Sequence, residues 1–160
     1  MRRLALSLPL LLLSASSALA QSNLCQGLGR LIEQAQSSFV DLPANLRLIP
    51  GSIQERRGFI TPTDGTPRRP MYVALMFQDS TPDATKLAMA KFRQVQGQIA
   101  RCVPGVQGQP LREPGNGAKV LWLLPLGQIA LVGAAGNIGG DNATSTVEIQ
   151  VAFHFAAGPF

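Results

Sequence analysis

Two segments of the chain place apolar residues three and four positions apart, which is the spacing of one face of an α-helix. The first segment covers residues 24–40, and the Leu42-Pro43 pair ends it because a residue before proline avoids helical dihedral angles. Its apolar stripe consists of Cys25, Leu28, Ile32, Ala35 and Phe39. This pattern predicts an amphipathic first helix.

The second helical segment begins near Thr81 and stops at Pro104-Gly105. Ser80 or Thr81 is expected to cap its free backbone amides, and Pro82 suits its first turn. Its apolar stripe consists of Ala84, Ala88, Phe92, Val95, Ile99 and Cys102. The segment therefore predicts a second helix with one face turned toward a core.

Five further segments have the alternating or continuous apolar patterns that are typical of β-strands. They are residues 53–60, 71–78, 120–124, 128–132 and 146–156. The turn-rich residues 61–67 join the first two into a long-looped hairpin, whereas residues 105–117 and 133–145 are interpreted as loops. The uncharged residues 120–136 contain Pro125 and several glycines, which favours a buried hairpin over a membrane span.

The order α-β-β-α-β-β-β predicts a two-layer α+β domain, an antiparallel sheet of four to five strands with two helices on one face. Cys25 and Cys102 are the two cysteines of the chain, and they lie at the ends of the two helical stripes. In an exported protein two cysteines indicate one disulfide. We expect that bond to join the helices side by side and antiparallel, with both stripes turned toward the sheet.

The N-terminal residues carry the pattern of a secretory signal peptide. Arg2 and Arg3 precede an apolar stretch over residues 4–13, and Ala18-Leu19-Ala20 is a small-x-small cleavage sequence. The apolar stretch is too short to cross about 30 Å of hydrocarbon. We therefore expect residues 1–20 to be removed and residues 21–160 to form one exported domain, periplasmic or secreted, without a transmembrane anchor.

Composition narrows the chemistry of this domain. The chain of 160 residues has a formal net charge of +5, and two of its basic residues belong to the predicted signal peptide. A mature chain so weakly basic does not indicate a nucleic-acid-binding protein. The single histidine, His154, alternates with apolar residues and shares a strand face with Glu148 and Gln150, without a nucleophile motif nearby. We expect no catalytic residues, no metal site and no cofactor.

Four arginines form the one cluster of charge. Arg56, Arg57, Arg68 and Arg69 lie toward the open end of the predicted hairpin. Guanidinium groups suit phosphate, sulfate or carboxylate, so an anionic ligand at this hairpin is one interpretation. The alternative is that the arginines protect a strand edge against pairing with other chains.

Residues 71–78 and 120–124 are apolar on both strand faces, which indicates burial on both sides of the sheet. The second face needs cover from the chain's own loops, a second copy, a protein partner or a ligand. Tyr72, Met76 and Trp122 are large enough to anchor an interface there, although alternation alone leaves the face of Trp122 open.

These patterns favour an exported cell-envelope binding protein of the adaptor, inhibitor or immunity type, without catalytic activity. A protein partner or self-association through the second sheet face is the expected mode of interaction. A carrier of a small anionic amphipathic ligand is the alternative, and a carboxylate-dependent hydrolase is the third hypothesis.

Overall fold

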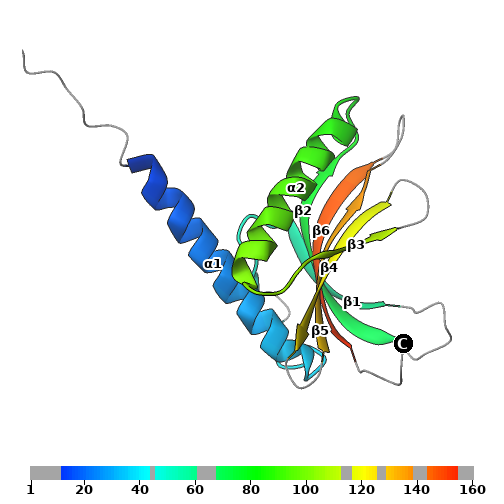
Figure 1. The fold of residues 1–160 in the computed structure, drawn as a ribbon. Coiled ribbons are helices and arrows are strands. Elements are labelled where there is room, and N and C mark those ends of the chain that lie inside the picture. The colour runs from blue at the N-terminus through cyan, green and yellow to red at the C-terminus, as the bar shows by residue number, and fades with distance from the viewer. Residues whose placement is uncertain are drawn as a thin grey trace, which may run out of the picture.

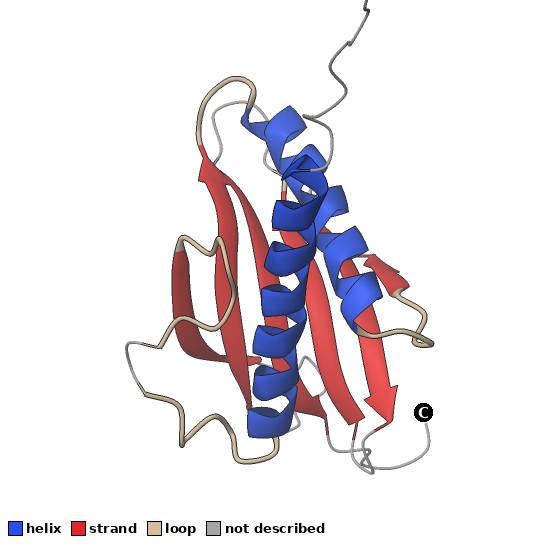
Figure 2. Cartoon of the chain, turned by 90° about the vertical axis from the view of Figure 1, so that its left-hand side faces the viewer, coloured by secondary structure: helices blue, strands red, loops and turns tan. Residues whose placement is uncertain are grey.

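The computed structural model describes residues 12–43, 46–60, 68–112, 117–125, 129–138 and 144–154. This part of the chain forms two helices and a six-stranded antiparallel sheet (Figure 1). The elements are α1 (Leu12–Ala35), β1 (Gln54–Ile60), β2 (Arg69–Asp79), α2 (Ala84–Cys102), β3 (Gln109–Arg112), β4 (Gly117–Pro125), β5 (Ile129–Asn137) and β6 (Ser145–His154). Both helices lie on the same face of the sheet, which confirms the predicted two-layer α+β fold (Figure 2).

The strands follow one another across the sheet in the order β1-β2-β6-β5-β4-β3. The predicted hairpin is confirmed, since β1 pairs with β2 from Gln54 opposite Leu75 to Ile60 opposite Arg69. The sheet has one strand more than expected. β3 lies in a segment interpreted as a loop, and it contains Pro110, which an edge strand tolerates because no neighbour needs its missing N–H.

The second helix matches its predicted stripe closely, since Ala84, Ala88, Phe92, Val95 and Ile99 are its buried residues. Its first turn differs from the expectation. Asp83 occupies the N-cap without a side-chain hydrogen bond, so the predicted cap by Ser80 or Thr81 is wrong.

The carboxylate of Asp79 organises the turn before α2 instead. It accepts hydrogen bonds from the backbone amides of Ser80 and Thr81, at 2.7 and 3.0 Å, and from the Thr81 hydroxyl at 2.7 Å. The bonds from Thr81, its side chain first, lower the pKa of Asp79. This acid therefore has a local structural role.

The first helix begins upstream of its predicted start and ends at Ala35 rather than at Val40. Its backbone runs continuously across the cleavage position expected after Ala20. At the other end, Ser38 and Phe39 have positive φ angles of 57° and 60°, and the Phe39 amide donates to the carbonyl of Gln34 at 2.9 Å. This turn still buries Phe39 completely, as the stripe predicted, with its ring centroid 5.8 Å from that of Tyr72.

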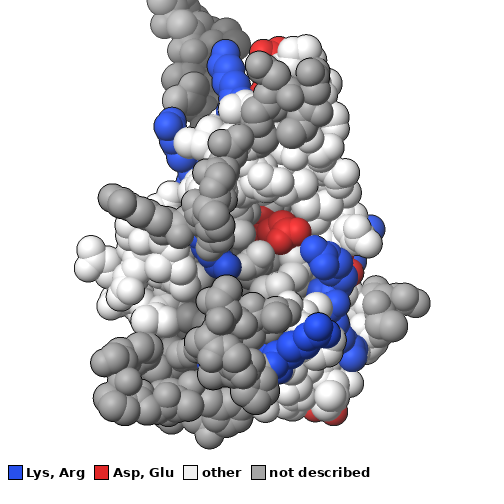
Figure 3. Space-filling view, turned by 90° about the vertical axis from the view of Figure 1, so that its right-hand side faces the viewer, with Lys and Arg blue, Asp and Glu red and all other residues white. Residues whose placement is uncertain are grey.

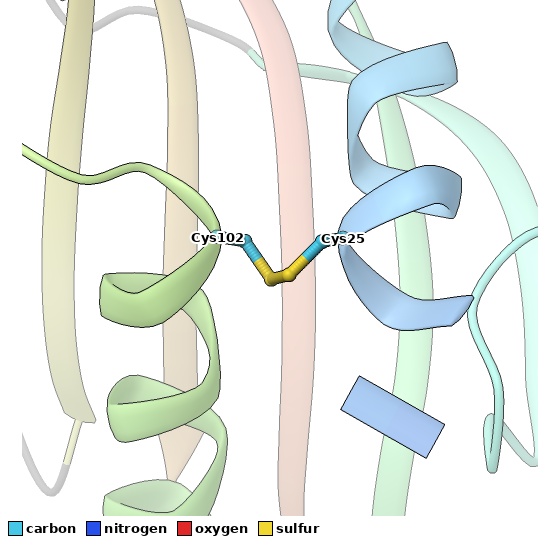
Figure 4. Close-up of a disulfide and its surroundings, with 2 residues drawn as sticks. All are labelled: Cys25 and Cys102. Carbon is cyan, nitrogen blue, oxygen red and sulfur yellow. A yellow bond between two sulfur atoms is a disulfide. The ribbon is translucent and has the colours of Figure 1, made fainter. Parts of the chain in front are cut away.

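The predicted disulfide between Cys25 and Cys102 is present and joins residues 77 positions apart (Figure 4). The predicted antiparallel arrangement of the helices is wrong, because both run from top to bottom in Figure 1, α1 from left to right and α2 from right to left. Cys25 lies partway along α1, so α1 continues past the end of α2 from the bridge onward. No helix in the described part of the chain is long and apolar enough to cross a membrane.

Candidate functional site

The hydrophobic core lies between the helices and the near face of the sheet, and it contains the three residues proposed as interface anchors. Tyr72, Met76 and Trp122 expose 5%, 6% and 2% of their surface and pack in the main core cluster. The expectation that Tyr72 and Met76 lie on the second face is therefore wrong. Because β2 is apolar on both faces, its pattern did not show which set the helices cover.

The face of the sheet opposite the helices is here called the distal face. It carries the side chains of each strand that alternate with the core residues. The strand register places on it Met71, Val73 and Leu75 of β2, Lys119, Leu121 and Leu123 of β4, Ala135 and Asn137 of β5, and Thr146, Glu148, Gln150 and Ala152 of β6. Val73 and Ala152 are buried, and the leucines are half-buried. In Figure 3, acidic and basic side chains lie next to one another on this side of the molecule.

The four arginines surround the β1–β2 hairpin but do not share one face. Arg56 and Arg57 are consecutive in β1, so they point to opposite faces. Arg56 lies on the distal face, whereas Arg57 lies on the helix side and donates a hydrogen bond to the carbonyl of Leu42. Arg68 is exposed just before β2, and Arg69 pairs with Ile60. An anionic ligand for all four together stays a prediction.

A hollow of about 310 Å³ opens on the distal face where β4, β5 and β6 run side by side. Its described lining consists of Gly117, Ala118, Lys119, Ala135, Gly136, Asn137, Thr146, Glu148 and Gln150. The register explains the space, because Ala135 lies between Lys119 on one side and Glu148 on the other. A methyl group between two long side chains leaves a depression with polar walls.

Glu148 is the fixed acidic group of this hollow. Its Oε1 lies 3.3 Å from Nη2 of Arg56, and its Oε2 accepts a hydrogen bond of 3.0 Å from Nε2 of Gln150. The Glu148 side chain is 20% exposed, so it reaches the hollow while both oxygens are engaged. Together with Lys119, Asn137 and Thr146, it presents donors and acceptors of hydrogen bonds to whatever enters.

The described lining of the hollow has a single carboxylate, and Arg56 and Gln150 already hold it. Glycosidase-type chemistry requires two carboxyl groups about 5–9.5 Å apart. Among the described residues, no three acids, cysteines or histidines gather in a way that could hold a metal ion. His154 belongs to β6, but its side chain lies outside the described residues. The side chains that line the hollow, among them Lys119, Asn137 and Thr146, can form hydrogen bonds with a bound group.

Glu55 is a residue whose role the sequence reasoning missed. Its carboxylate accepts hydrogen bonds from the backbone amides of Leu48 and Ile49, at 2.8 and 2.9 Å, from the Ser52 hydroxyl at 2.6 Å, and from the Tyr72 hydroxyl. This carboxylate fastens the segment after α1 onto the sheet. Burial, followed by the hydrogen bond to Glu55 and its charge, raises the pKa of Tyr72.

A weak signal for the Glu55 cluster exists in the sequence. Ser52 and Glu55 are three positions apart, the spacing at which a hydroxyl and a carboxylate satisfy nearby backbone groups in capping motifs. Here the spacing serves a turn before a strand rather than the start of a helix. The cluster holds the framework together and lies on the helix side, away from the hollow.

The fold and the hollow define a small, disulfide-linked two-layer α+β domain with a polar depression on its distal sheet face. Comparison with models of known protein families found no match for the chain, and comparison with curated proteins found none either.

Proposed function

We propose that the protein is an exported binding protein without catalytic activity, and that it recognises a protein partner through the hollow on its distal face. The observation that carries this proposal is the fixed Glu148 carboxylate at the wall of that hollow, beside Lys119, Asn137 and Thr146. These four side chains can recognise a partner by the positions of its hydrogen-bonding groups. An adaptor, an inhibitor or an immunity-type protein would use it in this way.

The size and chemistry of the hollow favour a protein partner over a small carried ligand. Small-molecule sites measure about 300–1,000 Å³ and are lined mainly by apolar side chains. The hollow is at the lower limit of that range, and charged, amide and hydroxyl side chains line it. Half-buried Leu75 and Leu121 adjoin it on the distal face, and a protein interface combines apolar contacts of this kind with direct hydrogen bonds.

Export is the second part of the proposal. It is supported by the signal-like N-terminus and by the Cys25–Cys102 disulfide, because disulfides persist in oxidising compartments and are rare in the cytosol. Intact-mass analysis and N-terminal sequencing of protein isolated from its own cells test this part. We expect a chain that begins at Gln21, and a chain that retains Arg2 and Arg3 would contradict it.

Site-specific photo-crosslinking in the organism that makes the protein tests the partner. A photoreactive residue replaces Asn137, which is exposed at the hollow, and as a matched control it replaces Leu87, which is exposed on α2. We expect one protein adduct from position 137 that is absent at position 87. The purified adduct partner should then bind the purified wild-type protein. Equal adducts at both positions, or a bound small molecule alone, would contradict the proposal.

A further inference from the structure

The two edges of the sheet differ in a way that concerns binding. β3 is a four-residue edge strand that contains Pro110, and short length and proline both discourage the addition of another strand. β1, at the other edge, extends over seven residues without proline. In the described part of the chain, no backbone group pairs with the outer side of β1. β1 therefore presents a strand-length row of hydrogen-bonding groups.

Exposed apolar and basic side chains flank this row. Ile53 before β1 and Phe59 near its end expose 51% and 64% of their surface. Arg57 donates a hydrogen bond to the carbonyl of Leu42, so the segment after α1 reaches this strand on the helix side. We use the name β1 edge for the surface formed by Ile53, Arg56, Arg57 and Phe59.

The charge of the β1 edge determines which strand fits it. A second copy of β1 paired so that its own arginines face Arg56 and Arg57 would place like charges opposite each other, which is destabilising. An acidic strand would instead gain charge-assisted hydrogen bonds. A guanidinium group has five N–H donors. Among the described residues, Arg56 contacts Glu148 and Arg57 contacts Leu42, each through Nη2.

We propose that β1 accepts an acidic, extended segment of another protein as an added edge strand. Residues opposite each other on paired strands share a face. The incoming strand therefore places acidic residues opposite Arg56 and Arg57, on its two faces, and an apolar residue opposite Phe59. The recognised pattern is two adjacent acids with an apolar residue two positions away. Backbone bonds supply affinity, and the alternate side chains supply specificity.

Two synthetic peptides test this proposal, one with glutamate-glutamate-threonine-phenylalanine between threonines and one with that order reversed. Binding to the mature, oxidised protein is followed by fluorescence anisotropy. We expect one orientation to bind better than the other, and a peptide with lysine in place of glutamate not to bind. Two N-methylated versions of the peptide are made, each with every second backbone amide methylated. In one register the methylated amides face β1, and in the other they face away from it. The register that blocks the groups facing β1 should weaken binding about tenfold or more, and the other register should not.

Charge-matched variants locate the site. Arg56→Gln with Arg57→Gln should weaken peptide binding about tenfold or more, whereas Lys86→Gln with Arg93→Gln, the same charge change at exposed positions of α2, should leave it within about twofold. The double variant Arg56→Gln with Phe59→Ala keeps the contact of Arg57 with Leu42. It is measured in place of the first variant if that variant does not fold.

Two results would overturn the proposal. The first is that neither acidic peptide binds, including the case in which anionic phosphatidylglycerol vesicles bind through the same arginines. The second is peptide binding that N-methylation weakens in neither register. Arg56 also contacts Glu148 at the hollow, but peptide binding by the wild-type protein is measured without the partner, so its outcome is distinct from that of the partner test.

Discussion

The hydroxyl of Tyr72 on β2 donates a hydrogen bond to the carboxylate of Glu55 on the adjacent strand β1. Glu55 also binds two backbone amides and the Ser52 hydroxyl in the segment that leads from α1 to the sheet. The Tyr72 ring meanwhile contacts Phe39 in the turn after α1. These two residues therefore connect the helix layer, the turn and the strand edge.

Tyr72→Phe is expected to keep the packing against Phe39 and to remove one of the four hydrogen bonds to Glu55. A hydrogen bond to a charged group contributes about 1.5–3 kcal/mol, so the free energy of unfolding should fall by roughly that amount. Urea unfolding at neutral pH measures it. An unchanged midpoint would show that the Tyr72 hydroxyl adds nothing to the fold.

The ionisation of Tyr72 should follow from the same contacts. Burial and Glu55 raise the pKa of the folded phenol above its usual value of about 10, so the folded protein holds its proton where the unfolded chain releases it. The stability from this group is present below pH 10 and is lost as the pH rises further. The chain has one tyrosine, so phenolate absorbance reports Tyr72 directly. Ionisation near pH 10 in the folded protein would contradict this account.

Cys25→Ser with Cys102→Ser should destabilise the domain strongly, because the bridge closes a long loop in the unfolded chain. For a sequence separation of 77 residues, chain entropy predicts a loss of about 4–5 kcal/mol. Since small domains are stable by about 5–15 kcal/mol, the variant should unfold at much lower urea concentration. Alkylation followed by intact-mass measurement of the wild type should detect no free thiol, and labelling of both cysteines would show that the bridge is absent.

Gly27 and Gly29 form a matched pair on α1. A Cβ atom at position 27 would lie 1.9 Å from the carbonyl oxygen of Leu48, whereas one at position 29 would meet nothing within 4 Å. Gly27→Ala should therefore displace the segment that Glu55 holds and lower the melting temperature by several degrees. Gly29→Ala should raise the free energy of unfolding by about 0.5–1 kcal/mol, because alanine favours helix. Equal effects of both substitutions would contradict the packing of α1 against Leu48.

The substitution Met76→Ala distinguishes between two roles for Met76, that of a core residue and that of a surface residue that anchors an interface. Met76 is 6% exposed within the core cluster, so its truncation should cost about 2–5 kcal/mol of stability. Leu87→Ala, at a position 47% exposed on α2, should cost far less and is the control. A thermal melt that shows no loss for Met76→Ala would restore this residue as a candidate for an interface.

The helical stripes were predictable because each helix buries one face only. Ala84 through Ile99 recur at helical spacing, and the structure buries that set. The end of α1 was not predictable, because Ser38 and Phe39 take left-handed backbone angles that such residues rarely adopt. The burial of Phe39 was anticipated, although the turn that achieves it was not.

The candidate site was not predictable from single strands. Ala135, Glu148 and Lys119 form the hollow only through the register of three strands, and no local pattern contains that register. The face occupied by Tyr72 was equally undetermined, because β2 is apolar on both sides. The weak alternation of residues 53–60 gave the position of β1 but did not reveal that Glu55 is enclosed by backbone amides.

The most direct test of the proposed binding site fills the hollow. Ala135→Phe places a ring between Lys119 and Glu148, and Gln109→Phe adds the same ring at an exposed position of β3 on the distal face. Titration calorimetry with the partner identified by crosslinking at position 137 measures both variants. We predict that Ala135→Phe weakens binding about tenfold or more with little change in melting temperature, and that Gln109→Phe binds as the wild type does. Undiminished binding by a folded Ala135→Phe variant would contradict recognition through the hollow.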